Sequence, residues 1–541
     1  MAATNKARAG HPLFQQNLLD RAIAYFDPKR AQQRMMARGV LALAGGYNGA
    51  RRDKAQLSSW NPGSGSPTTD AVADLPTLRD RSRDEMRNSG VAAGALNGAI
   101  TGTVGTGLSA NPAPDHELLG ISLEKAKAWA RNTRRRFETW AASTDCDVSR
   151  TCDFYDLQSL GKRTWLESGD GFVLTPRIAH PGRPMRLALQ LIEGDRCCNP
   201  NRSANTPTLI EGVELDPVTQ APVRYHFARR HPGDYYAGGN TWDARDAYAT
   251  NGRRNVLHLF TPLRPGQVRG MPWLAPILEP LKQLDRWTEN ELNAAVTSSI
   301  FSVFAKMDPQ AFQDIFDADG ESEDLIKQRS QWTGELTSGK AINLLPGEEL
   351  GSVSSTRPNP LFDPFWTAMV RQIGMALEIP FEVLVMHFQS SYSAARGALL
   401  MAWKFYRGRR ELLAKKFCQP VYELWLADEV AEGRIAAPAF FADDMVRAAW
   451  SRCLWTGDGP GAIDPGKEVA AAEKRVALGI STLEQESILH DGIDWETKHR
   501  QRVVEVRARQ SDGIANTTPG TPDPATDPAA TDPNADNNNG Q

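Results

Sequence analysis

The chain has 541 residues, of which 41% are hydrophobic and 23% charged, so most of it can bury a core and it is not globally disordered. At roughly 150 residues per domain, this length predicts three or four domains or one elongated subunit with several substructures. The 62 basic and 65 acidic residues nearly cancel, which argues against a protein that coats DNA by charge alone, and six cysteines are too few for a disulfide framework. No secretory signal or all-apolar span occurs, so we expect a cytosolic protein unless an assembly carries it elsewhere.

The first predicted elements are an extended arm and a glycine-patterned helix. Residues 51–70 form a loop rich in Pro, Gly, Ser and Thr. A charged helix is expected over 77–89, with Thr77 as its N-cap. Four glycines then recur every four residues and would give a helix one smooth face for close packing, which we favour over dimerisation in a membrane. These glycines are Gly90, Gly94, Gly98 and Gly102.

Residues 123–142 have a strongly amphipathic helical pattern. Apolar positions recur three and four residues apart along this stretch. Arg131 and residues 134–136 fall largely off the apolar face, and we interpret them as a solvated face or an interface rim rather than a phosphate-binding site. The face comprises Leu123, Ala126, Trp129, Thr133, Phe137 and Trp140.

Between residues 169 and 263 the pattern changes to strands. Large apolar residues alternate strictly over 185–191, as in a half-buried strand. Further strands are predicted over 208–215, 222–227 and 255–260, separated by turns that contain Pro and Gly. We therefore predict a β-rich subdomain of roughly a hundred residues.

The C-terminal half is predicted to be mainly helical. Helices are expected over 281–304, about 36 Å long at 1.5 Å per residue, and over 362–377. The longest helix covers 393–431, nearly 60 Å, and should bend at Gly408 and Pro420. The other predicted segments are a strand over 341–345, shorter helices over 464–479 and 483–490, and a disordered tail over 510–541.

Motifs that would indicate catalysis or cofactor binding are incomplete. Residues 334–341 have the Gly-x4-Gly-Lys spacing of a phosphate-binding loop, but an alanine stands where a Ser or Thr must ligate Mg²⁺, and a strand rather than a helix follows. Residues 102–107 have the wrong glycine order for a dinucleotide fingerprint, and a helix end or turn explains them better. Cysteines and histidines lack metal-site spacing, and Ser390 and Ser391 near His387 lack a third orienting group. We expect no catalytic residue, no metal site and no cofactor.

One cluster of chemically informative residues remains, near the start of the longest predicted helix. Seven bases accompany a single acid, Glu411, and aromatic residues are interleaved with them. We favour a solvated or intersubunit face as the explanation and keep transient contact with nucleic-acid phosphates as the alternative. The bases are Arg396, Lys404, Arg407, Arg409, Arg410, Lys415 and Lys416.

Several short motifs, in their order along the chain, resemble the portal proteins of tailed bacteriophages in the lambda-type branch. The resemblance covers about residues 50–505, and it is carried by the order of the motifs rather than by any single one. The most specific motifs are Arg264-Pro-Gly-Gln-Val-Arg-Gly270 with Pro272-Trp-Leu-Ala-Pro276, Ile379-Pro-Phe-Glu-Val-Leu384 followed by Ser391-Tyr-Ser-Ala-Ala-Arg396, and Trp455 with Asp464-Pro-Gly-Lys-Glu468.

The resemblance implies an α+β portal-type subunit that assembles as a ring, usually of twelve copies. Such a subunit has a β-rich wing, two long stem helices, a mixed clip, a long bent helix and a helical crown side. The implied divisions are an N-terminal arm (1–75), a wing with the β-rich subdomain (76–270), a first stem helix (271–305), a clip (306–357), a second stem helix (358–378), a tunnel loop (379–393), a long bent wing helix (394–431), a crown-side helical region (432–510) and a disordered tail (511–541).

The function that the resemblance implies is structural, without catalysis. The ring would stand at one vertex of the capsid, nucleate capsid assembly, and form the channel through which double-stranded DNA is packaged and ejected. The implied partners are further copies of the chain, the terminase large subunit, a head-completion or connector protein, the major capsid and scaffold proteins, and the DNA genome, with no membrane. The implied location is the virion, and the host cytoplasm during assembly.

Three sets of residues are expected at the channel. Positively charged side chains near the loop would contact DNA, and acidic side chains on the first stem helix would repel the phosphates if they face inward. The loop itself comprises Met386, His387, Phe388, Gln389, Ser390, Ser391 and Tyr392. The basic set is Arg396, Lys404 and Arg407, and the acidic set is Asp285, Glu289 and Glu291.

Two alternative functions stay open at this point. One is a different virion ring component, such as a head–tail adaptor, although such proteins are usually shorter or richer in strands. The other is a nucleotide-driven packaging motor subunit, against which the alanine at position 341 argues.

Overall fold

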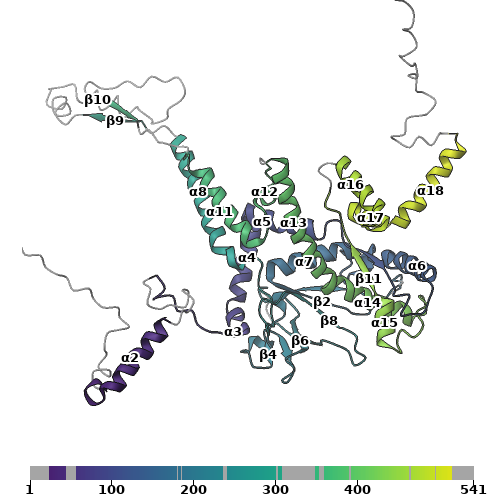
Figure 1. Cartoon of the computed structure of the whole chain (residues 1–541), viewed down its shortest axis with the longest axis horizontal. Helices are drawn as coiled ribbons and strands as arrows, with labels where there is room; N and C mark the ends of the chain where they lie inside the picture. Colours follow the sequence, from purple (N-terminus) through teal and green to yellow (C-terminus); the bar gives the residue numbers. More distant parts are fainter. Residues whose placement is uncertain are drawn as a thin grey trace, which may run out of the picture. The chain divides into compact units, whose positions relative to one another are not determined.

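The computed structural model divides the chain into two compact units, Met1–Ser66 and Pro67–Gln541. The described residues are 23–43, 56–179, 181–183, 185–234, 240–299, 303–307, 348–352, 359–388, 391–461, 465–493 and 495–513. Helix α2 (Pro28–Leu43) belongs to the first unit, and the elements named below belong to the second, which mixes helices with small sheets (Figure 1). In the described part of the chain, no helix combines the length and apolar content needed to cross a membrane.

The N-terminal part of the second unit is helical. Helix α4 begins two residues before the predicted start, because Asp74 occupies the N-cap position and Pro76 lies in the first turn; Thr77 is therefore not the cap. Ser122 caps α6 by accepting a hydrogen bond from the Lys125 amide (3.3 Å). The predicted apolar face of α6 is buried or half-buried except for Leu123, which is 52% exposed. The helices are α3 (Pro67–Val72), α4 (Leu75–Asn88), α5 (Gly90–Thr103), α6 (Leu123–Ala141) and α7 (Phe154–Ser168).

Helix α5 carries the four-residue glycine repeat, and its packing differs along that face. A Cβ atom added to Gly102 would lie 2.6 Å from the ring of Tyr406 in α13 (Tyr392–Leu413). A Cβ atom added to Gly90, Gly94 or Gly98 would meet no described atom within 4 Å. The predicted close packing is thus confirmed at Gly102 but not at the other three positions.

Four antiparallel sheets lie in the described part of the second unit, and one of them, the β9–β10 pair, is described with the long helices below. A three-stranded sheet has the order β3-β2-β8, a four-stranded sheet has the order β4-β5-β6-β7, and β1 pairs with β11 alone. The last pair joins distant parts of the chain, because Ser109 lies opposite Thr456 and Asn111 donates a hydrogen bond to the Thr456 hydroxyl (2.7 Å). The strands are β1 (Ser109–Pro112), β2 (Asp170–Leu174), β3 (Gln190–Glu193), β4 (Leu209–Ile210), β5 (Val213–Leu215), β6 (Pro222–Ala228), β7 (Trp242–Asp246), β8 (Val256–Phe260) and β11 (Cys453–Thr456).

The predicted β-rich subdomain is confirmed, with differences at its strand boundaries. The strand predicted over 208–215 is two strands, β4 and β5, because the chain turns at Glu211 and Gly212, both with positive φ. The alternating run over 185–191 is largely irregular, and only its end belongs to β3. Its buried side chains nevertheless point into the core, since Leu187 and Leu189 are fully buried and form isolated bridges.

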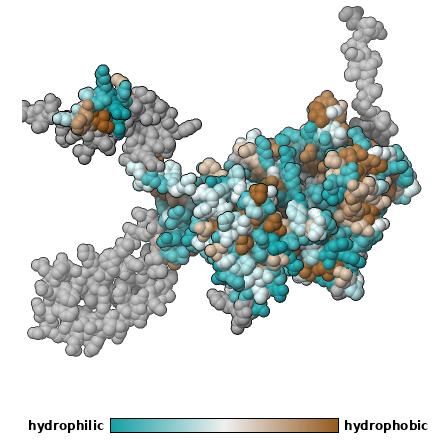
Figure 2. Space-filling model, turned by 90° about the horizontal axis from the view of Figure 1, so that it is seen from below, coloured by the Kyte–Doolittle hydropathy of each residue, from teal (hydrophilic) through white to brown (hydrophobic). Residues whose placement is uncertain are grey.

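The largest hydrophobic cluster joins α6 and α7 to a helix from the C-terminal half. The Phe137 ring lies edge-on to the Trp425 ring at a centroid distance of 5.1 Å, and Phe154 contacts Phe417 at 5.5 Å. All four side chains are essentially buried. The core is therefore built from segments far apart in sequence, held by aromatic packing. On the face drawn in Figure 2, hydrophilic and hydrophobic surface is intermixed, and the larger hydrophobic patches lie toward the right.

Two of the predicted long helices pack against each other. Helix α8 (Leu278–Ser299) and α11 (Phe362–Leu377) run side by side in Figure 1, and the Trp287 ring stacks on Phe362 at 4.7 Å. The prediction for 362–377 is confirmed residue for residue. The prediction of a helix to 304 is wrong at its end, because Val303 already belongs to strand β9 (Val303–Met307), which pairs with β10 (Glu348–Ser352). The strand predicted over 341–345 lies outside the described residues.

The longest predicted helix is confirmed as a continuous helical stretch from Tyr392 to Ala431. It comprises α13, a π-helical segment (Ala414–Cys418, η7) and α14 (Gln419–Ala431). The π-helical segment ends two residues before Pro420, which has no N–H group to donate in the helical hydrogen-bond pattern. Gly408 lies inside α13 without interrupting its helical assignment, and the bend expected at that residue stays a prediction.

Four helices follow toward the C-terminus. Those predicted over 464–479 and 483–490 are confirmed as α16 and α17, whereas α18 was not predicted as a separate helix. Of the tail predicted over 510–541, only residues 510–513 are described, so the prediction of disorder lies outside the described residues. The helices are α15 (Asp444–Ser451), α16 (Pro465–Ala477), α17 (Leu483–Asp491) and α18 (Trp495–Ser511).

Candidate functional site

Helix α13 presents a basic face to solvent. Arg396, Lys404 and Arg407 are all exposed, at positions separated by eight, eleven and three residues, which places them on one side of a helix. The opposite side, with Ala402 and Tyr406, is buried. The structure thus brings the three predicted DNA-contacting bases together on one exposed surface, which we call the α13 basic face.

Three further bases of the predicted cluster bond to other parts of the subunit, whereas Lys415 is exposed and pairs with Glu411 four residues earlier (3.1 Å). Arg409 forms an ion pair with Glu378 (3.5 Å). Arg410 donates a hydrogen bond to the backbone carbonyl of Asp458 (2.9 Å), and Lys416 donates to a backbone carbonyl of β8. The basic cluster therefore contains side chains that bond within the subunit and side chains that face solvent. Their spacing in the sequence does not distinguish the two kinds.

The predicted channel loop connects the short helix α12 (Phe381–Leu384) to α13. Met386, His387 and Phe388 are exposed, and so are Ser391 and Tyr392 at the start of α13. Gln389 and Ser390 lie outside the described residues. The exposed fractions of Met386 (76%) and Tyr392 (47%) are high for apolar side chains, so this loop offers apolar surface beside the basic face.

The turn before this loop explains part of the motif Ile379–Leu384. Glu378 ends α11 in the left-handed conformation (φ 60°), and the Ile379 amide donates a hydrogen bond to the Gly374 carbonyl (2.9 Å). A Cβ atom on Gly374 would lie 2.8 Å from the Ile379 carbonyl oxygen. The motif therefore sets a tight reversal between α11 and α12 and positions the loop.

The three predicted acidic residues of α8 differ in their surroundings. Asp285 is half-buried and accepts a hydrogen bond from the Ser89 hydroxyl (3.2 Å), so it contributes to the contact of α8 with the α4–α5 junction. Glu291 is half-buried and accepts a hydrogen bond from Asn359 (3.4 Å). Glu289 is the exposed member of the set.

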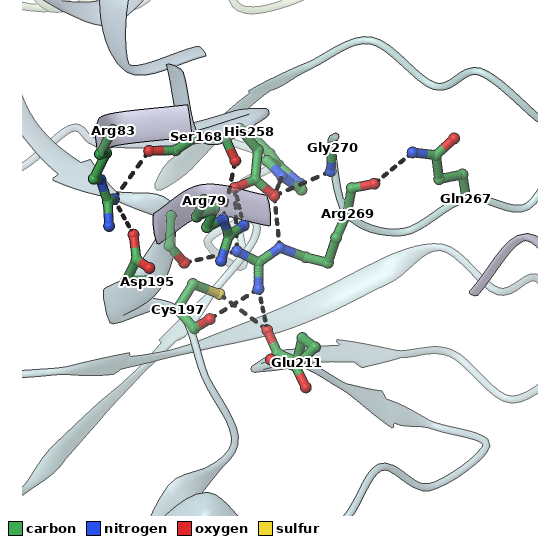
Figure 3. Close-up of polar contacts among 12 residues, drawn as sticks. Arg79, Arg83, Ser168, Asp195, Cys197, Glu211, His258, Gln267, Arg269 and Gly270 are labelled. Atoms are coloured by element: carbon green, nitrogen blue, oxygen red, sulfur yellow. Dashed lines mark hydrogen bonds and ion pairs between the residues drawn. The ribbon is translucent and has the colours of Figure 1, made fainter. Parts of the chain in front are cut away.

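A buried ionic cluster lies where β2 meets α4 and the loop before α8 (Figure 3). Asp170, the first residue of β2, is completely buried. Its carboxylate accepts hydrogen bonds from the guanidinium of Arg269 (2.6 Å) and from that of Arg79 (2.7 Å). The His258 ring lies 3.4 Å away, and the Gly270 amide donates at 3.1 Å. We call these residues the Asp170 cluster.

The protein itself saturates the Asp170 cluster. Arg269 also donates to the backbone carbonyls of Cys197 (2.8 Å) and Gly194 (2.7 Å). Burial alone would raise the pKa of Asp170, but Arg269 and Arg79 outweigh it and hold that pKa well below its usual value. Burial lowers the pKa of His258 to about 4, so this ring is neutral near pH 7. The described partners occupy the cluster's hydrogen-bonding groups, so its role is to join elements rather than to bind a substrate.

The motif Arg264–Gly270 was among the most specific in the resemblance to portal proteins, and its residues shape a loop of the fold. Gln267 accepts a hydrogen bond from the Leu263 amide (2.8 Å) and donates one to the Arg269 carbonyl (2.7 Å), which shapes the loop that delivers Arg269. At Gly270 the chain crosses Gly169 so closely that a Cβ atom on either glycine would meet backbone atoms at less than 3.0 Å. The sequence did not identify Asp170 or Arg79 as members of this cluster. Asp170 appears there only as a charge beside an apolar stretch, and Arg79 only as one arginine of a charged helix.

The glycine pattern of residues 102–107 is confirmed as a helix end and turn. Helix α5 ends at Thr103, and Gly105 has a φ of 60°. The Thr106 amide and hydroxyl donate to the Asp458 carboxylate (3.0 and 2.8 Å), and a Cβ atom on Gly105 would collide with that carboxylate. The glycines therefore allow close approach of another chain segment, not of a dinucleotide.

Lys162 of α7 is a buried base with an aromatic neighbour. Lys162 is only 2% exposed, and its amino nitrogen lies 4.6 Å from the centre of the Trp165 ring. Burial lowers the pKa of Lys162 to about 7, and repulsion from Arg409 acts in the same direction. The position therefore disfavours the ammonium ion compared with a lysine in water.

Replacing Lys162 with methionine is expected to raise the melting temperature at pH 7, because an apolar chain of similar length needs no desolvation of charge. In the wild type, the unfolded chain binds more protons at this lysine than the folded chain between about pH 7 and about pH 10, so the free energy of unfolding should rise with pH in that window. The variant should lose this rise. Thermal unfolding of both proteins from pH 6 to 10 measures it, and Lys125→Met, at an exposed lysine of α6, is the control.

The described part of the chain contains neither a metal-binding cluster nor a disulfide. In the described ranges, no group of three or more His, Cys, Asp or Glu side chains is arranged to hold a metal ion. All six cysteines are free thiols; Cys146, Cys197 and Cys418 are buried, and the other three are half-buried. Residues 334–341, with their phosphate-loop spacing, lie outside the described residues, as does Ser390.

Comparison with known proteins relates the chain to one family. A family model described as phage portal protein, lambda family, matches residues 53–410. The portal protein B of Escherichia phage lambda is 27% identical over 489 residues, which cover 87% of this chain and 91% of that protein. The portal protein of Escherichia phage N15 is 26% identical over 490 residues, again covering 87% and 91%.

Two solved structures were also found among those similar in shape. A chain from the virion of the native gene transfer agent particle is 15% identical, with a TM-score of 0.43, and the match covers 77% of this chain and 92% of that one. A chain from the neck of the native gene transfer agent particle, computed with C12 symmetry, is 13% identical, with a TM-score of 0.40 and the same coverage.

Proposed function

The chain belongs to the lambda family of phage portal proteins, and from this premise we propose that its copies form a closed ring around a channel for double-stranded DNA. The ring, of twelve copies, stands at one vertex of the capsid. A ring needs a head-to-tail interface whose rotation closes, so each copy must offer two different and complementary surfaces. As a phage portal protein the chain is a virion component, and we propose that it assembles in the host cytoplasm.

The observation that carries this proposal, besides the family match, is the α13 basic face. It places Arg396, Lys404 and Arg407 on one exposed side, after the predicted channel loop, in which Met386 and Phe388 are exposed apolar residues. Few phosphate contacts per subunit give weak, salt-sensitive attraction, which lets DNA slide. The net charge of −3 agrees with a channel that does not hold its cargo tightly. We therefore assign transient DNA contact to this face and to the loop.

We further propose that α8 contributes negative charge to the channel wall. Glu289 is exposed and is the member of the acidic set best able to face passing phosphates. Asp285 and Glu291 are bonded to Ser89 and Asn359, so they add to the local potential while also fixing the helix. Repulsion along this wall would lower the friction on moving DNA.

The remaining partners follow from the same premise. Residues 306–357, only partly described, would form the clip that docks the terminase large subunit and later a head-completion or connector protein. The work of packaging would come from the terminase, since this chain supplies the conduit and no catalysis. Contacts with the major capsid and scaffold proteins would let the ring nucleate capsid assembly, and residues 432–510 would lie on its crown side.

The triple variant Arg396→Glu/Lys404→Glu/Arg407→Glu tests the assigned face. We expect it to form rings, seen by electron microscopy of the purified protein, because these side chains are exposed in the subunit. The fraction of particles that retain full-length DNA should fall several-fold, because three phosphate contacts per subunit become repulsions. The control is Lys125→Glu, which makes one such charge change at an exposed position of α6. Normal DNA-filled particles from the triple variant would contradict the assignment, and a wild-type chain that never forms rings would contradict the proposed function.

A further inference from the structure

The three C-terminal helices α16, α17 and α18 enclose an open groove. Its volume is about 1070 Å³, and apolar side chains of all three helices line it, including Val469, Leu483, Val503 and Val506. These helices lie together at the upper right of Figure 1. We call this feature the C-terminal groove. A cavity of this size that opens to solvent leaves apolar surface in contact with water.

The three helices have almost no core of their own. Helices α16 and α18 contain no buried residue in their described ranges, and Ser487 is the buried residue of α17. The module is tied to the rest of the subunit by polar contacts, such as the ion pair of Glu496 with Lys127 of α6 (2.6 Å). Helices of 13 and 17 residues that bury nothing gain little stability from packing. The apolar groove therefore needs an occupant.

A matching projection lies on the same module. The turn between α16 and α17 carries Leu478 and Ile480, which are 73% and 71% exposed. Gly479, between them, has a φ of 69°, which makes the turn sharp. Exposed charges of both signs flank the turn, namely Glu473, Lys474 and Glu484, while Arg475 forms an ion pair with Glu486 of α17 (2.7 Å). We call these residues the 478–480 knob.

The charges of the two features are complementary. Arg502 and Arg507 line the groove from α18 and are exposed, and with Lys498 they outnumber the acidic Glu468 of the same lining. Glu473, Lys474 and Glu484 around the knob sum to one negative charge, so an apolar knob with a negative balance meets an apolar groove with a positive one. The knob and the groove are different surfaces of one copy. The knob of one copy can therefore bind the groove of a second, whose own knob can bind a third, and this is a head-to-tail contact.

We propose that the 478–480 knob of one copy of the chain occupies the C-terminal groove of the next copy. The inference rests on the proposed ring and names one of its interfaces. It makes α16 to α18 a shared module, whose core is completed only when neighbouring copies meet. The apolar side chains Leu478 and Ile480 then leave water together with Val503 and Val506.

Disulfide trapping in the full-length chain tests the contact. In the variant Ile480→Cys/Val506→Cys, oxidation should link neighbouring copies, giving a ladder of covalent oligomers on a non-reducing gel. The matched control is Ile480→Cys/Val504→Cys, because Val504 is 61% exposed and does not line the groove. Each single-cysteine variant, with the six native thiols present, gives the background.

The outcomes separate the inference from the proposed function. A ladder in the first variant but not in the controls supports the contact. Rings that form normally, yet give no more ladder than the controls, overturn the inference and leave the ring intact. A chain that stays monomeric at all concentrations overturns the ring, and the contact with it.

Charge reversal gives a second, independent measurement. Glu484→Lys and Arg507→Glu should each weaken self-association several-fold in sedimentation velocity, and the double variant should recover most of the loss, since the pair is then re-formed with opposite polarity. Arg509→Glu, also on α18 but outside the groove, is the control and should leave self-association unchanged. Additive losses in the double variant would overturn the proposed pairing of knob and groove.

Discussion

Replacing Asp170 with asparagine is expected to lower the free energy of unfolding by about 3–5 kcal/mol, because it leaves buried positive charge without its partner. Arg269 and Arg79 both converge on this carboxylate, and Arg269 is completely buried. The variant should therefore unfold at much lower denaturant concentration or accumulate as insoluble protein. Urea unfolding followed by circular dichroism measures the difference.

The control for this prediction is Asp243→Asn. Asp243 forms an ion pair with Arg229 (2.9 Å), but the arginine side chain is 65% exposed, so the loss should be below about 1 kcal/mol. Equal effects of the two substitutions would show that burial does not set the strength of the Asp170 cluster.

The Asp170 cluster also predicts the acid response of the wild type. The pKa of Asp170 is held well below its usual value, so its contribution is present above about pH 4 and is lost as the pH falls further. The pKa of His258 is lowered to about 4, so the unfolded chain takes up a proton there first, between about pH 6.5 and pH 4. Both groups make the fold less stable on acidification. In Asp170→Asn the free energy of unfolding should fall less steeply below pH 4 than in the wild type.

Replacing Gly169 with alanine is expected to lower the free energy of unfolding by about 2–5 kcal/mol. Gly169 has a φ of 86°, and a Cβ atom there would lie closer than 3.0 Å to the backbone of Gly270, Met271 and Pro272. Backbone atoms cannot move aside as a side chain can. The loop that carries Arg269 would shift, so the variant should lose both the crossing and part of the Asp170 cluster.

Gly252→Ala separates the two causes of this loss. Gly252 has a similar φ of 78°, but no described atom lies within 4 Å of the position of a Cβ. It should lose only about 1 kcal/mol, the cost of the backbone conformation. Comparison of the two melting temperatures isolates the steric part, and a Gly169→Ala protein as stable as Gly252→Ala would refute the crowding argument.

The elements best predicted from sequence are those whose pattern is local. The apolar spacing of 362–377 predicts α11 with its observed ends, and the longest helix is predicted to within one residue at its start. Strands β1 and β7 were missed because their sequences, Ser-Ala-Asn-Pro and Trp-Asp-Ala-Arg-Asp, together contain only one large apolar residue and no β-branched one. Their conformation depends on the partner strand rather than on local propensity.

The candidate site shows the same limit. Charge and spacing identified the bases of α13. Only the folded structure shows that Lys404 is exposed, whereas Arg410 donates a hydrogen bond to the backbone carbonyl of Asp458. The motif around Arg269 was recognised by resemblance, whereas its partner Asp170 lies 99 positions earlier, and no local signal links the two. Long-range pairing of charges is decided by topology, which a single sequence does not display.

The pairing of β1 with β11 has a consequence for how the subunit is made. The hydrogen bond between Asn111 and Thr456 spans 345 positions, so at 5–20 residues per second a ribosome needs roughly 20–70 s to supply the second strand after the first. Until then, β1 has no strand partner, and a chain that stops early never obtains one. Polypeptides that end before residue 456 therefore cannot complete this pair of strands.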